Sequence, residues 1–240
     1  MTKTLDRLKS RAIGLTTQFA IRNFMDVVHR TDYVRKFSWF GRPILQLPTD
    51  VMALQELIWE IQPRAIVECG IGFGGLTTFL SSMMHACHND EGIVCGVDMQ
   101  VTELDLDELS ATPYSENIEL VEGDSVSMST FRKVKRLCRG KKPLLVILDS
   151  DHTHSHVLAE LQLYSQLVTV GSYIVVMDTT IEFLDPKYIS KGKPWCKGNN
   201  PMTAVWEFME GNKKFKIDKS IPDKILLTSA ADGWLKRVSK

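Results

Sequence analysis

The feature that most constrains the fold is a regular alternation of short apolar runs with helix-like stretches, which begins near residue 63. The runs are four to seven residues long and almost continuously apolar, as strands covered by helices on both faces must be. They occupy residues 65–68, 92–98, 118–121, 144–149 and 173–178. Helical patterns lie between them, for example at 76–88 and 156–167. The alternation predicts an α/β fold with a doubly wound, mostly parallel sheet.

The C-terminal part of the chain departs from this alternation. Three short runs at 215–218, 224–228 and 233–238 are separated only by short turns, one of which contains proline. They predict antiparallel strands added to one edge of the sheet.

The N-terminal part is helical in pattern. Apolar residues recur with helical spacing at 19–28 and again at 51–58, and an aromatic link with Gly and Pro lies between them at 37–43. We expect residues 1–62 to form an N-terminal helical cap on the same domain as the sheet, which would occupy residues 63–240.

Composition and charge argue against several classes of protein. The 240 residues carry 29 Lys and Arg against 29 Asp and Glu, so the chain lacks the basic character of a dedicated nucleic-acid binder. No apolar stretch reaches the ~18 residues needed to span a bilayer, and the first residues lack the apolar region of a secretion signal. The five cysteines are scattered and form no Cys-x-x-Cys pair, which is typical of reduced thiols. We expect a cytoplasmic protein that binds neither nucleic acid nor membrane.

A glycine-rich turn between a strand and a helix is the densest functional signal. Gly70, Gly72 and Gly75 match the dinucleotide pattern G-x-G-x-x-G, whereas Glu68, Gly70, Gly72 and Gly74 match E-x-G-x-G-x-G, the turn of S-adenosylmethionine (SAM) methyltransferases. A carboxylate at Glu68 suits the cationic amino-acid end of SAM and would repel a pyrophosphate. The turn therefore favours SAM over a dinucleotide, with a ligand-free turn as the third alternative.

Acidic residues at the ends of two further strands extend this candidate cofactor site. Asp98 could accept hydrogen bonds from both ribose hydroxyls of SAM, although it would suit NAD equally well. The next strand ends near Asp124 and Ser125, at a place where methyltransferases put an adenine contact.

A second constellation follows the fourth strand. Asp149 and His152 are three residues apart, and Asp178 ends the neighbouring strand, so the two carboxylates can meet at the same edge of the sheet. Two such carboxylates suit Mg²⁺, which takes few protein ligands and keeps several waters. The alternating histidines also suggest a zinc site. A polar turn with solvated imidazoles describes His154 and His156 better than a metal role does.

A third cluster opens with residues 194–201, a Gly-Asn-Asn-Pro loop with aromatic flanks that leads into a helix. Two interpretations stay open. The loop closes over a substrate, or it is a surface connector.

Taken together, these segments resemble the cephalosporin hydroxylase-like family, whose members are also described as rhamnosyl O-methyltransferases. The resemblance runs from about Phe37 to Val238. It rests on Trp39-Phe40-Gly41-Arg42-Pro43, Gln46-Leu47-Pro48, the Glu68 glycine turn, Leu148-Asp149-Ser150-Asp151-His152, Gly198-Asn199-Asn200-Pro201 with Ala204-Val205-Trp206, and Asp232-Gly233-Trp234-Leu235. It implies a Rossmann-like SAM-methyltransferase fold, often oligomeric, that acts with Mg²⁺ on hydroxyls of sugars or natural products.

The resemblance also implies roles for individual residues. In related metal-dependent enzymes an Asp after the fourth strand and an acidic pair after the fifth hold the metal. Asp149 and Asp178 match these positions, with Met177 in place of the first acid of the pair. A histidine at the position of His152 acts as general base in macrolide-sugar relatives.

We therefore predict a SAM-dependent O-methyltransferase for a small-molecule or glycan acceptor, which we expect to be a homo-oligomer. Glu68, Gly70, Gly72, Gly74, Asp98, Asp124, Ser125 and Asp149 would line the SAM site, Asp149 and Asp178 would hold Mg²⁺, and His152 and Asp149 would be catalytic. An NAD-dependent oxidoreductase is the alternative enzyme, but no Tyr-x-x-x-Lys pair supports it. A non-catalytic SAM- or sugar-binding protein is the remaining alternative.

Overall fold

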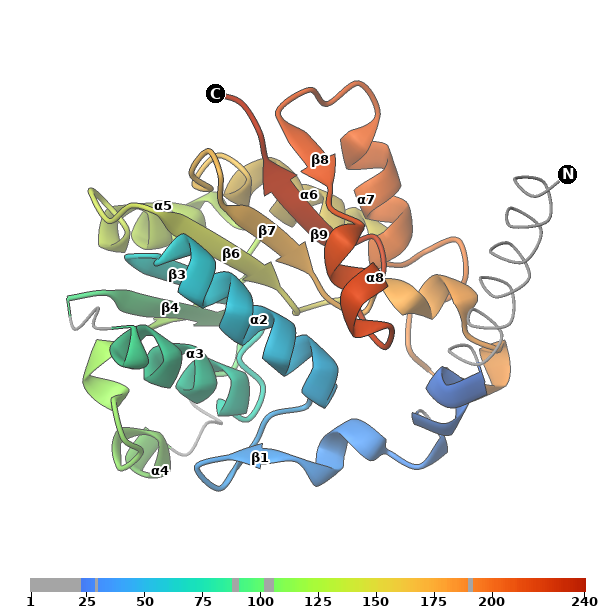
Figure 1. Ribbon diagram of the computed structural model, residues 1–240, viewed down its shortest axis with the longest axis horizontal. Coiled ribbons are helices and arrows are strands. Elements are labelled where there is room, and N and C mark those ends of the chain that lie inside the picture. The colour runs from blue at the N-terminus through green and yellow to red at the C-terminus, as the bar shows by residue number, and fades with distance from the viewer. Residues whose placement is uncertain (1–22, 29, 88–90, 102–105, 190–191) are drawn as a thin grey trace, which may run out of the picture.

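The protein is built around a seven-stranded sheet with the strand order β5-β4-β3-β6-β7-β9-β8 (Figure 1). The computed structural model describes residues 23–28, 30–87, 91–101, 106–189 and 192–240. The strands are β3 (Ala65–Cys69), β4 (Ile93–Asp98), β5 (Ile118–Glu122), β6 (Leu144–Leu148), β7 (Tyr173–Val176), β8 (Phe215–Ile217) and β9 (Trp234–Arg237). Neighbours among β3 to β7 pair in parallel, so the five strands predicted from apolar runs are confirmed.

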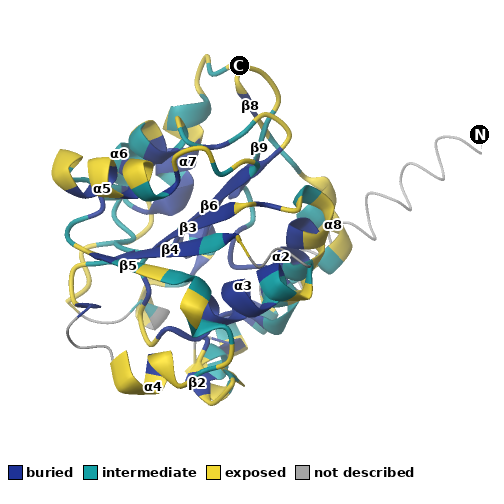
Figure 2. Ribbon diagram, turned by 90° about the vertical axis from the view of Figure 1, so that its left-hand side faces the viewer, coloured by how far each residue is buried: buried dark blue, intermediate teal, exposed yellow. Residues whose placement is uncertain are grey.

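Helices cover both faces of the sheet, as the nearly continuous apolar strands require. The helices α2 (Pro48–Ile61), α3 (Gly75–Ala86) and α8 (Ser220–Ile225) lie on one side, and α5 (Met128–Leu137), α6 (His154–Tyr164) and α7 (Pro201–Met209) lie on the other (Figure 2). Successive residues of β3 alternate between the two cores, so Ile66 packs into the cluster with α2 and α3 and Val67 into the cluster with α5, α6 and α7. The result is a three-layer α/β structure.

The strand order reverses between β3 and β6, which are parallel neighbours in the middle of the sheet. From β3 the chain runs outward through β4 and β5 to one edge, and then returns to β6 and β7 on the other side. In open α/β sheets, ligands bind at such a switch point, outside the carboxyl ends of the strands. The Glu68 turn follows β3 and Asp149 follows β6, so the topology brings these two predicted site segments together.

The N-terminal segment before α2 folds over the start of α3. The aromatic link forms a small antiparallel pair, β1 (Ser38–Trp39) with β2 (Arg42–Pro43), which the sequence pattern did not predict. The Trp39 ring packs edge-on against Phe79 of α3 at 5.1 Å, and a Cβ atom at Gly75 would lie 2.2 Å from the Pro43 carbonyl oxygen. Only glycine therefore permits this close approach.

The predicted cap is described from residue 23 onward. The first part of it, including the periodic residues 19–22, lies outside the described residues. Residues 23–28 are helical, and α2 supplies the second predicted helix. The division of the chain at residue 62 stays a prediction.

The predicted strand at 224–228 is wrong. Residues Ser220–Ile225 form the short helix α8, which places Ile221 and Ile225 one helical turn apart, and both pack against the core beside α2 and α3. The loop that follows is held by the buried Asp50 of α2, whose Oδ2 accepts hydrogen bonds from the Ser229 N–H at 2.8 Å and the Ser229 hydroxyl at 3.1 Å. The antiparallel edge itself is present, because β9 pairs antiparallel with β7 and with β8.

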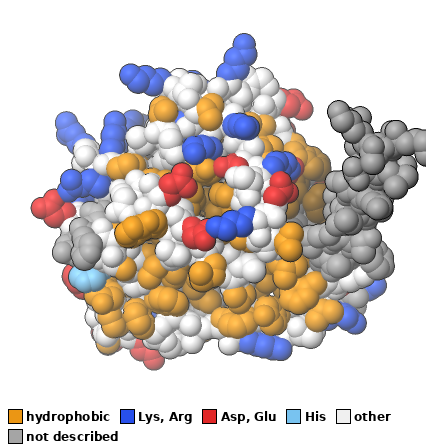
Figure 3. Space-filling model, viewed as in Figure 1, with side chains coloured by type: hydrophobic (Ala, Val, Ile, Leu, Met, Phe, Trp, Pro, Cys, Tyr) orange, Lys and Arg blue, Asp and Glu red, His pale blue; other side chains and the backbone are white. Residues whose placement is uncertain are grey.

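One face of the molecule divides into an apolar and a charged part. Apolar side chains gather over its lower part, below α2 and around β1, and Lys and Arg side chains lie along its upper edge (Figure 3). The exposed large hydrophobic side chains of α2 and of the β1–β2 turn are Met52, Trp59 and Phe40. Among the residues that the structure describes, no helix is both long and apolar enough to cross a membrane.

Candidate active site

The glycine turn is shaped by the strands on either side of β3. Gly70 has a φ of +91°, and a Cβ atom there would lie 2.2 Å from the Asp149 carbonyl oxygen, so the turn after β3 packs directly on the turn after β6. Gly72 and Gly74 also have positive φ, and Gly74 is the residue that precedes α3. The glycines are therefore needed for the turn itself, and the absence of side chains also leaves its main chain accessible to a ligand.

Glu68 is a buried carboxyl with a free oxygen. Its Oε2 accepts a hydrogen bond from the Thr77 hydroxyl at 2.6 Å, whereas its Oε1 has no hydrogen-bond partner in the described part of the chain. Burial raises the pKa of Glu68 from 4.5 to about 8, the Thr77 hydrogen bond opposes this, and the charge of Asp98 adds to it. A buried acceptor without a donor is costly, so this site favours a cationic N–H donor beside Glu68.

Asp98 holds the glycine turn in place from the end of β4. Its Oδ2 accepts hydrogen bonds from the N–H groups of Ile71 at 2.9 Å and Gly72 at 3.4 Å, and its Oδ1 accepts one from the Gln100 N–H at 3.0 Å. An ionised carboxylate has about four acceptor sites, so Asp98 can still accept hydrogen bonds from a ligand.

Asp124 and Ser125 follow β5 and differ in their surroundings. Asp124 Oδ1 accepts a hydrogen bond from the Val126 N–H at 3.1 Å and is only partly buried. Ser125 is buried, and its hydroxyl donates to Glu160 Oε1 at 2.5 Å. The Ser125 side chain therefore belongs to an internal network.

Asp149, His152 and Asp178 come together at the carboxyl ends of β6 and β7. One ligand atom from each lies within 4.8 Å of the other two, so the three residues form a group that could hold a metal ion. The His152 Nε2 lies 3.3 Å from the Asp178 Oδ2, and the side chains of His152 and Asp178 are 17% and 40% exposed. The sequence pattern predicted that the two carboxylates meet, and the structure adds the His152 imidazole as a third potential ligand.

The carboxyl of Asp149 lies in a strongly acidic environment. Burial, together with the negative charges of Asp178 and Glu68, raises its pKa well above the usual value, while a hydrogen bond from Gln46 lowers it. Repulsion between carboxylates that share a site is relieved when a cation binds among them. The electrostatics of this crevice therefore favour positively charged ligands.

Met177 does not face this crevice. Its side chain is buried in the core cluster beside α2 and α3. Asp178 has a left-handed backbone, with a φ of +53°, at the start of the 3-10 helix η4 (Thr179–Phe183). This conformation ends β7 and presents the Asp178 carboxylate beside His152. The position that holds the first acid of the pair in metal-dependent relatives is thus part of the core in this chain.

The expectation that His154 and His156 are solvated is wrong. His154 Nδ1 lies 2.8 Å from the Thr203 hydroxyl and its Nε2 lies 3.0 Å from Glu207 Oε2, so this ring links α6 to α7. His156 Nε2 lies 3.0 Å from the Ser125 hydroxyl oxygen. The two rings are 27% and 20% exposed, and neither belongs to the group around Asp149.

The loop at 194–200 reaches the same site. The Trp195 ring packs edge-on against the His152 ring at 4.8 Å, and the Lys193 ammonium lies 4.7 Å from the Trp195 centroid. Glu182 of η4 fixes the loop, because its Oε2 accepts hydrogen bonds from the Gly198 N–H at 2.8 Å and the Asn200 amide at 2.6 Å. This placement favours the interpretation that the loop covers a substrate over that of a surface connector.

Gln46 is a site residue that sequence reasoning missed. Its amide donates a hydrogen bond to Asp149 Oδ2 at 2.7 Å, although it lies 103 residues away in the chain, and it is only 4% exposed. Gln46 directly precedes Leu47 and α2, so the N-terminal segment closes one side of the crevice. Its only signal in the sequence was its place in a segment shared with the resembled family.

Comparison with known protein families agrees with this site geometry. A sequence profile described as Rhamnosyl O-methyltransferase/CmcI matches residues 31–238. The chain belongs to this family. The family that was predicted from the sequence is thereby confirmed.

Two relatives illustrate the degree of similarity. The rhamnosyl O-methyltransferase of Mycobacterium leprae is 33% identical over 147 residues, which cover 60% of this chain and 61% of the relative. The chain thus spans less than two thirds of that protein. The rhamnosyl O-methyltransferase of Mycobacterium tuberculosis is 27% identical over 212 residues, which cover 84% of this chain and 78% of the relative.

Solved structures confirm the Rossmann-like methyltransferase fold. The apo structure of CmcI matches with a TM-score of 0.62 and 22% identity and covers 86% of this chain and 78% of its own. Its Mg–SAM form matches with a TM-score of 0.63 and 22% identity over 85% of this chain and 78% of its own. The O-methyltransferase from Bacillus cereus matches with a TM-score of 0.54 and 14% identity, over 82% and 81% of the two chains.

Proposed function

We propose that this protein is a SAM-dependent O-methyltransferase that methylates a hydroxyl of a sugar or a natural product. The relatives named as rhamnosyl O-methyltransferases support the sugar hydroxyl, and the family supports the reaction. The observation that best supports SAM as the cofactor is the acidic crevice at the switch point of the sheet. In this crevice the Oε1 of buried Glu68, beside the glycine turn, has no hydrogen-bond partner among the described residues.

The acidic charge of the crevice favours SAM over NAD as the ligand. SAM carries a sulfonium and an ammonium against one carboxylate, and the two cationic groups would relieve the repulsion among the ionised forms of Glu68, Asp149 and Asp178. A dinucleotide would bring a doubly negative pyrophosphate to the same turn and add to that repulsion. The geometry therefore supports the E-x-G-x-G-x-G interpretation of the glycine turn.

In the proposed site the cofactor contacts come from the carboxyl ends of three strands, β3, β4 and β5. Glu68 would accept a hydrogen bond from the ammonium, and the main chain at Gly70 and Gly72 would border the amino-acid end, with Gly74 at the start of α3. Asp98 would bind the ribose hydroxyls through its remaining acceptor sites. The Asp124–Ser125 segment would border the adenine.

The chemical step needs a methyl group aligned with the acceptor oxygen and a base for the acceptor proton. When bound, SAM supplies an electrophilic methyl group, and Mg²⁺ supplies a positive charge that lowers the pKa of a nearby hydroxyl. Asp149 and Asp178 would hold the cation beside the cofactor. His152 would take the acceptor proton, and the carboxylate of Asp178, which lies 3.3 Å from the His152 Nε2, would stabilise the imidazolium that forms.

The acceptor would enter between the N-terminal segment and the loop at 194–200. Trp195 lies against His152 and offers an aromatic face, on which the C–H face of a sugar ring can pack. The loop is held by Glu182, so this wall is prepared before an acceptor arrives. We expect acceptor specificity to depend on these residues and on Gln46, which contacts Asp149.

Methylation assays with acceptors that differ only in their hydroxyl groups test this function. We expect SAM to be converted to S-adenosylhomocysteine (SAH) in the presence of rhamnose-containing glycosides, and the methyl group to appear on a sugar oxygen. The same glycosides with the sugar hydroxyls blocked should give no turnover. Equal turnover with and without a free hydroxyl would contradict the proposal.

The metal role of Asp178 has its own test. Asp178→Asn removes one of two carboxylates that would hold the cation, so we expect the Mg²⁺ concentration that half-saturates the rate to rise by at least roughly tenfold. SAH affinity, measured by calorimetry, should stay unchanged. Asp107→Asn, an exposed acid on α4 (Leu106–Ser110), is the matched control. A methylation rate that is insensitive to EDTA would show that these aspartates do not act through a metal.

A further inference from the structure

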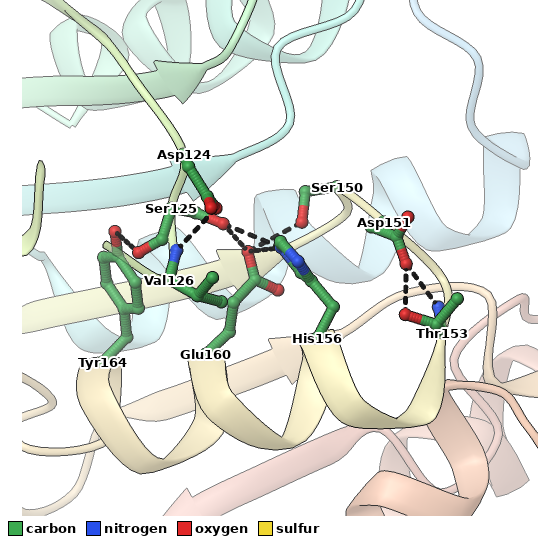
Figure 4. A network of polar contacts seen from close by, with 9 residues as sticks. All are labelled: Asp124, Ser125, Val126, Ser150, Asp151, Thr153, His156, Glu160 and Tyr164. Carbon is green, nitrogen blue, oxygen red and sulfur yellow. Dashed lines mark hydrogen bonds and ion pairs between the residues drawn. The ribbon is translucent and has the colours of Figure 1, made fainter. Parts of the chain in front are cut away.

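One face of α6 carries a polar cluster that lies beneath the ends of β5 and β6 (Figure 4). His156, Glu160 and Tyr164 are spaced four residues apart and so point to the same side of the helix. Glu160 Oε1 accepts hydrogen bonds from the hydroxyls of Ser125 at 2.5 Å and Ser150 at 2.7 Å. The Tyr164 hydroxyl donates to the Ser125 carbonyl oxygen at 3.0 Å. A single carboxyl oxygen thus joins the turn after β5 to the turn after β6, although β4 and β3 lie between these two strands in the sheet.

The two turns belong to different parts of the proposed site. Ser125 follows Asp124 and lies at the proposed adenine edge, whereas Ser150 follows the proposed metal ligand Asp149. Glu160 touches neither ligand position itself. It holds the two turns, at Ser125 and Ser150, that border the proposed adenine and metal positions.

Glu160 needs a positive charge close to it. Its side chain is fully buried, and its Oε2 has no hydrogen-bond partner among the described residues. A buried carboxylate is stable only when it is paired with a cation and hydrogen-bonded. The His156 Nε2 lies 3.4 Å from Glu160 Oε1, and the His156 ring is 20% exposed, so it can exchange protons with solvent.

The charges around His156 favour its protonated form. Burial opposes the charge, but the hydrogen bond and the charge of Glu160 on α6, together with the carboxylates of Asp151 after β6 and Asp124 after β5, raise the pKa of His156 above its usual value. Near neutral pH a larger fraction of this imidazole is therefore charged than in water. Above its pKa, the buried carboxylate of Glu160 loses its counter-charge.

We propose that Glu160 and protonated His156 form a positioning pair that holds Ser125, and with it the adenine edge of the cofactor site, in the binding conformation. This inference rests on the proposed SAM site. Loss of the His156 charge leaves the buried Glu160 carboxyl without its counter-charge, and the contacts of both side chains with the Ser125 hydroxyl then loosen. Cofactor affinity then depends on the protonation of a residue that does not touch the cofactor.

Calorimetric titration of SAH between pH 5.5 and 8.5 tests this pair. The variants are His156→Gln, which keeps a hydrogen-bond donor without the charge, and Glu160→Gln, which keeps the shape of the carboxyl. The ratio of variant to wild-type Kd cancels the titration of Glu68, which both proteins share. We expect this ratio for His156→Gln to be about five- to tenfold near pH 6 and to approach one at pH 8.5, within the usual range for coupled sites. Glu160→Gln should follow the same trend.

The matched control is His154→Gln, because His154 is on the same helix but contacts Thr203 and Glu207 of α7. Its ratio should stay near one at every pH, and circular dichroism should confirm that each variant is folded. The positioning pair alone would be overturned by one result. In that result the wild type binds SAH and His156→Gln is folded, but the ratio of their Kd values does not change with pH. Absence of SAH binding by the wild type would contradict the proposed function, and this inference with it.

Discussion

Replacing His152 by alanine is expected to lower kcat by roughly 10²–10⁴, the usual contribution of a positioned general base. The ring lies 3.3 Å from Asp178 and against Trp195, at the strand ends where the acceptor must meet the methyl group. SAH affinity should change little, because the cofactor contacts come from the turns after β3, β4 and β5. Single-turnover methylation rates and calorimetry with SAH separate the two effects.

The control for this variant is His154→Ala, since the His154 ring links α6 to α7 and lies outside the group around Asp149. It should lose far less activity. If His152→Ala instead mainly raises the Mg²⁺ requirement and excess Mg²⁺ restores the rate, then His152 is a metal ligand and not the base. Turnover near that of the wild type would exclude both roles.

The Glu68→Gln variant is expected to bind SAM and SAH roughly 10- to 100-fold more weakly, because a charge-assisted hydrogen bond to the ammonium is replaced by a neutral one. The change hardly alters the shape of the buried side chain. Calorimetric Kd values for SAH give the size of the loss. The matched control is Glu119→Gln, an exposed carboxyl on β5, which should bind SAH as the wild type does. Unchanged affinity in Glu68→Gln would remove Glu68 from the cofactor site.

Glu68 also gives the free protein a defined pH dependence. Its pKa is about 8 in the folded state and near its ordinary value of 4.5 in the unfolded chain, so between these values the folded state binds the additional proton. The stability that Glu68 contributes therefore falls as pH rises from about 4.5 to 8, by a few kcal/mol at most. Glu68→Gln should lack this decline, as measured by denaturant unfolding at several pH values. In the wild type, SAM binding near pH 7 should release a proton.

The fold was largely predictable from sequence because each buried strand is a short, continuous apolar run between helix-length segments. The error at 224–228 has a physical cause. Ile225 and Leu226 look like part of a strand, but Ile221 and Ile225 lie one helical turn apart and only the tertiary contact with the core beside α2 decides between the two structures. The β1–β2 pair was missed because two-residue strands leave no periodic signal.

The candidate site was predictable where it follows from topology. Asp149 and Asp178 end neighbouring parallel strands, so their proximity could be inferred without coordinates. Gln46 and Trp195 reach the site from distant segments, through contacts that no local pattern encodes. Glu160 left a weak signal, an acid on the buried face of a helix four residues after a histidine.

Parallel calorimetric titrations of the purified protein with SAM and with NADH show whether the crevice binds SAM or a dinucleotide. Native mass spectrometry of protein purified without added ligand extends the same measurement. We expect binding of one SAM per chain, no heat with NADH, and retained SAM or SAH in the mass spectrum. Heat with NADH and none with SAM would contradict this expectation.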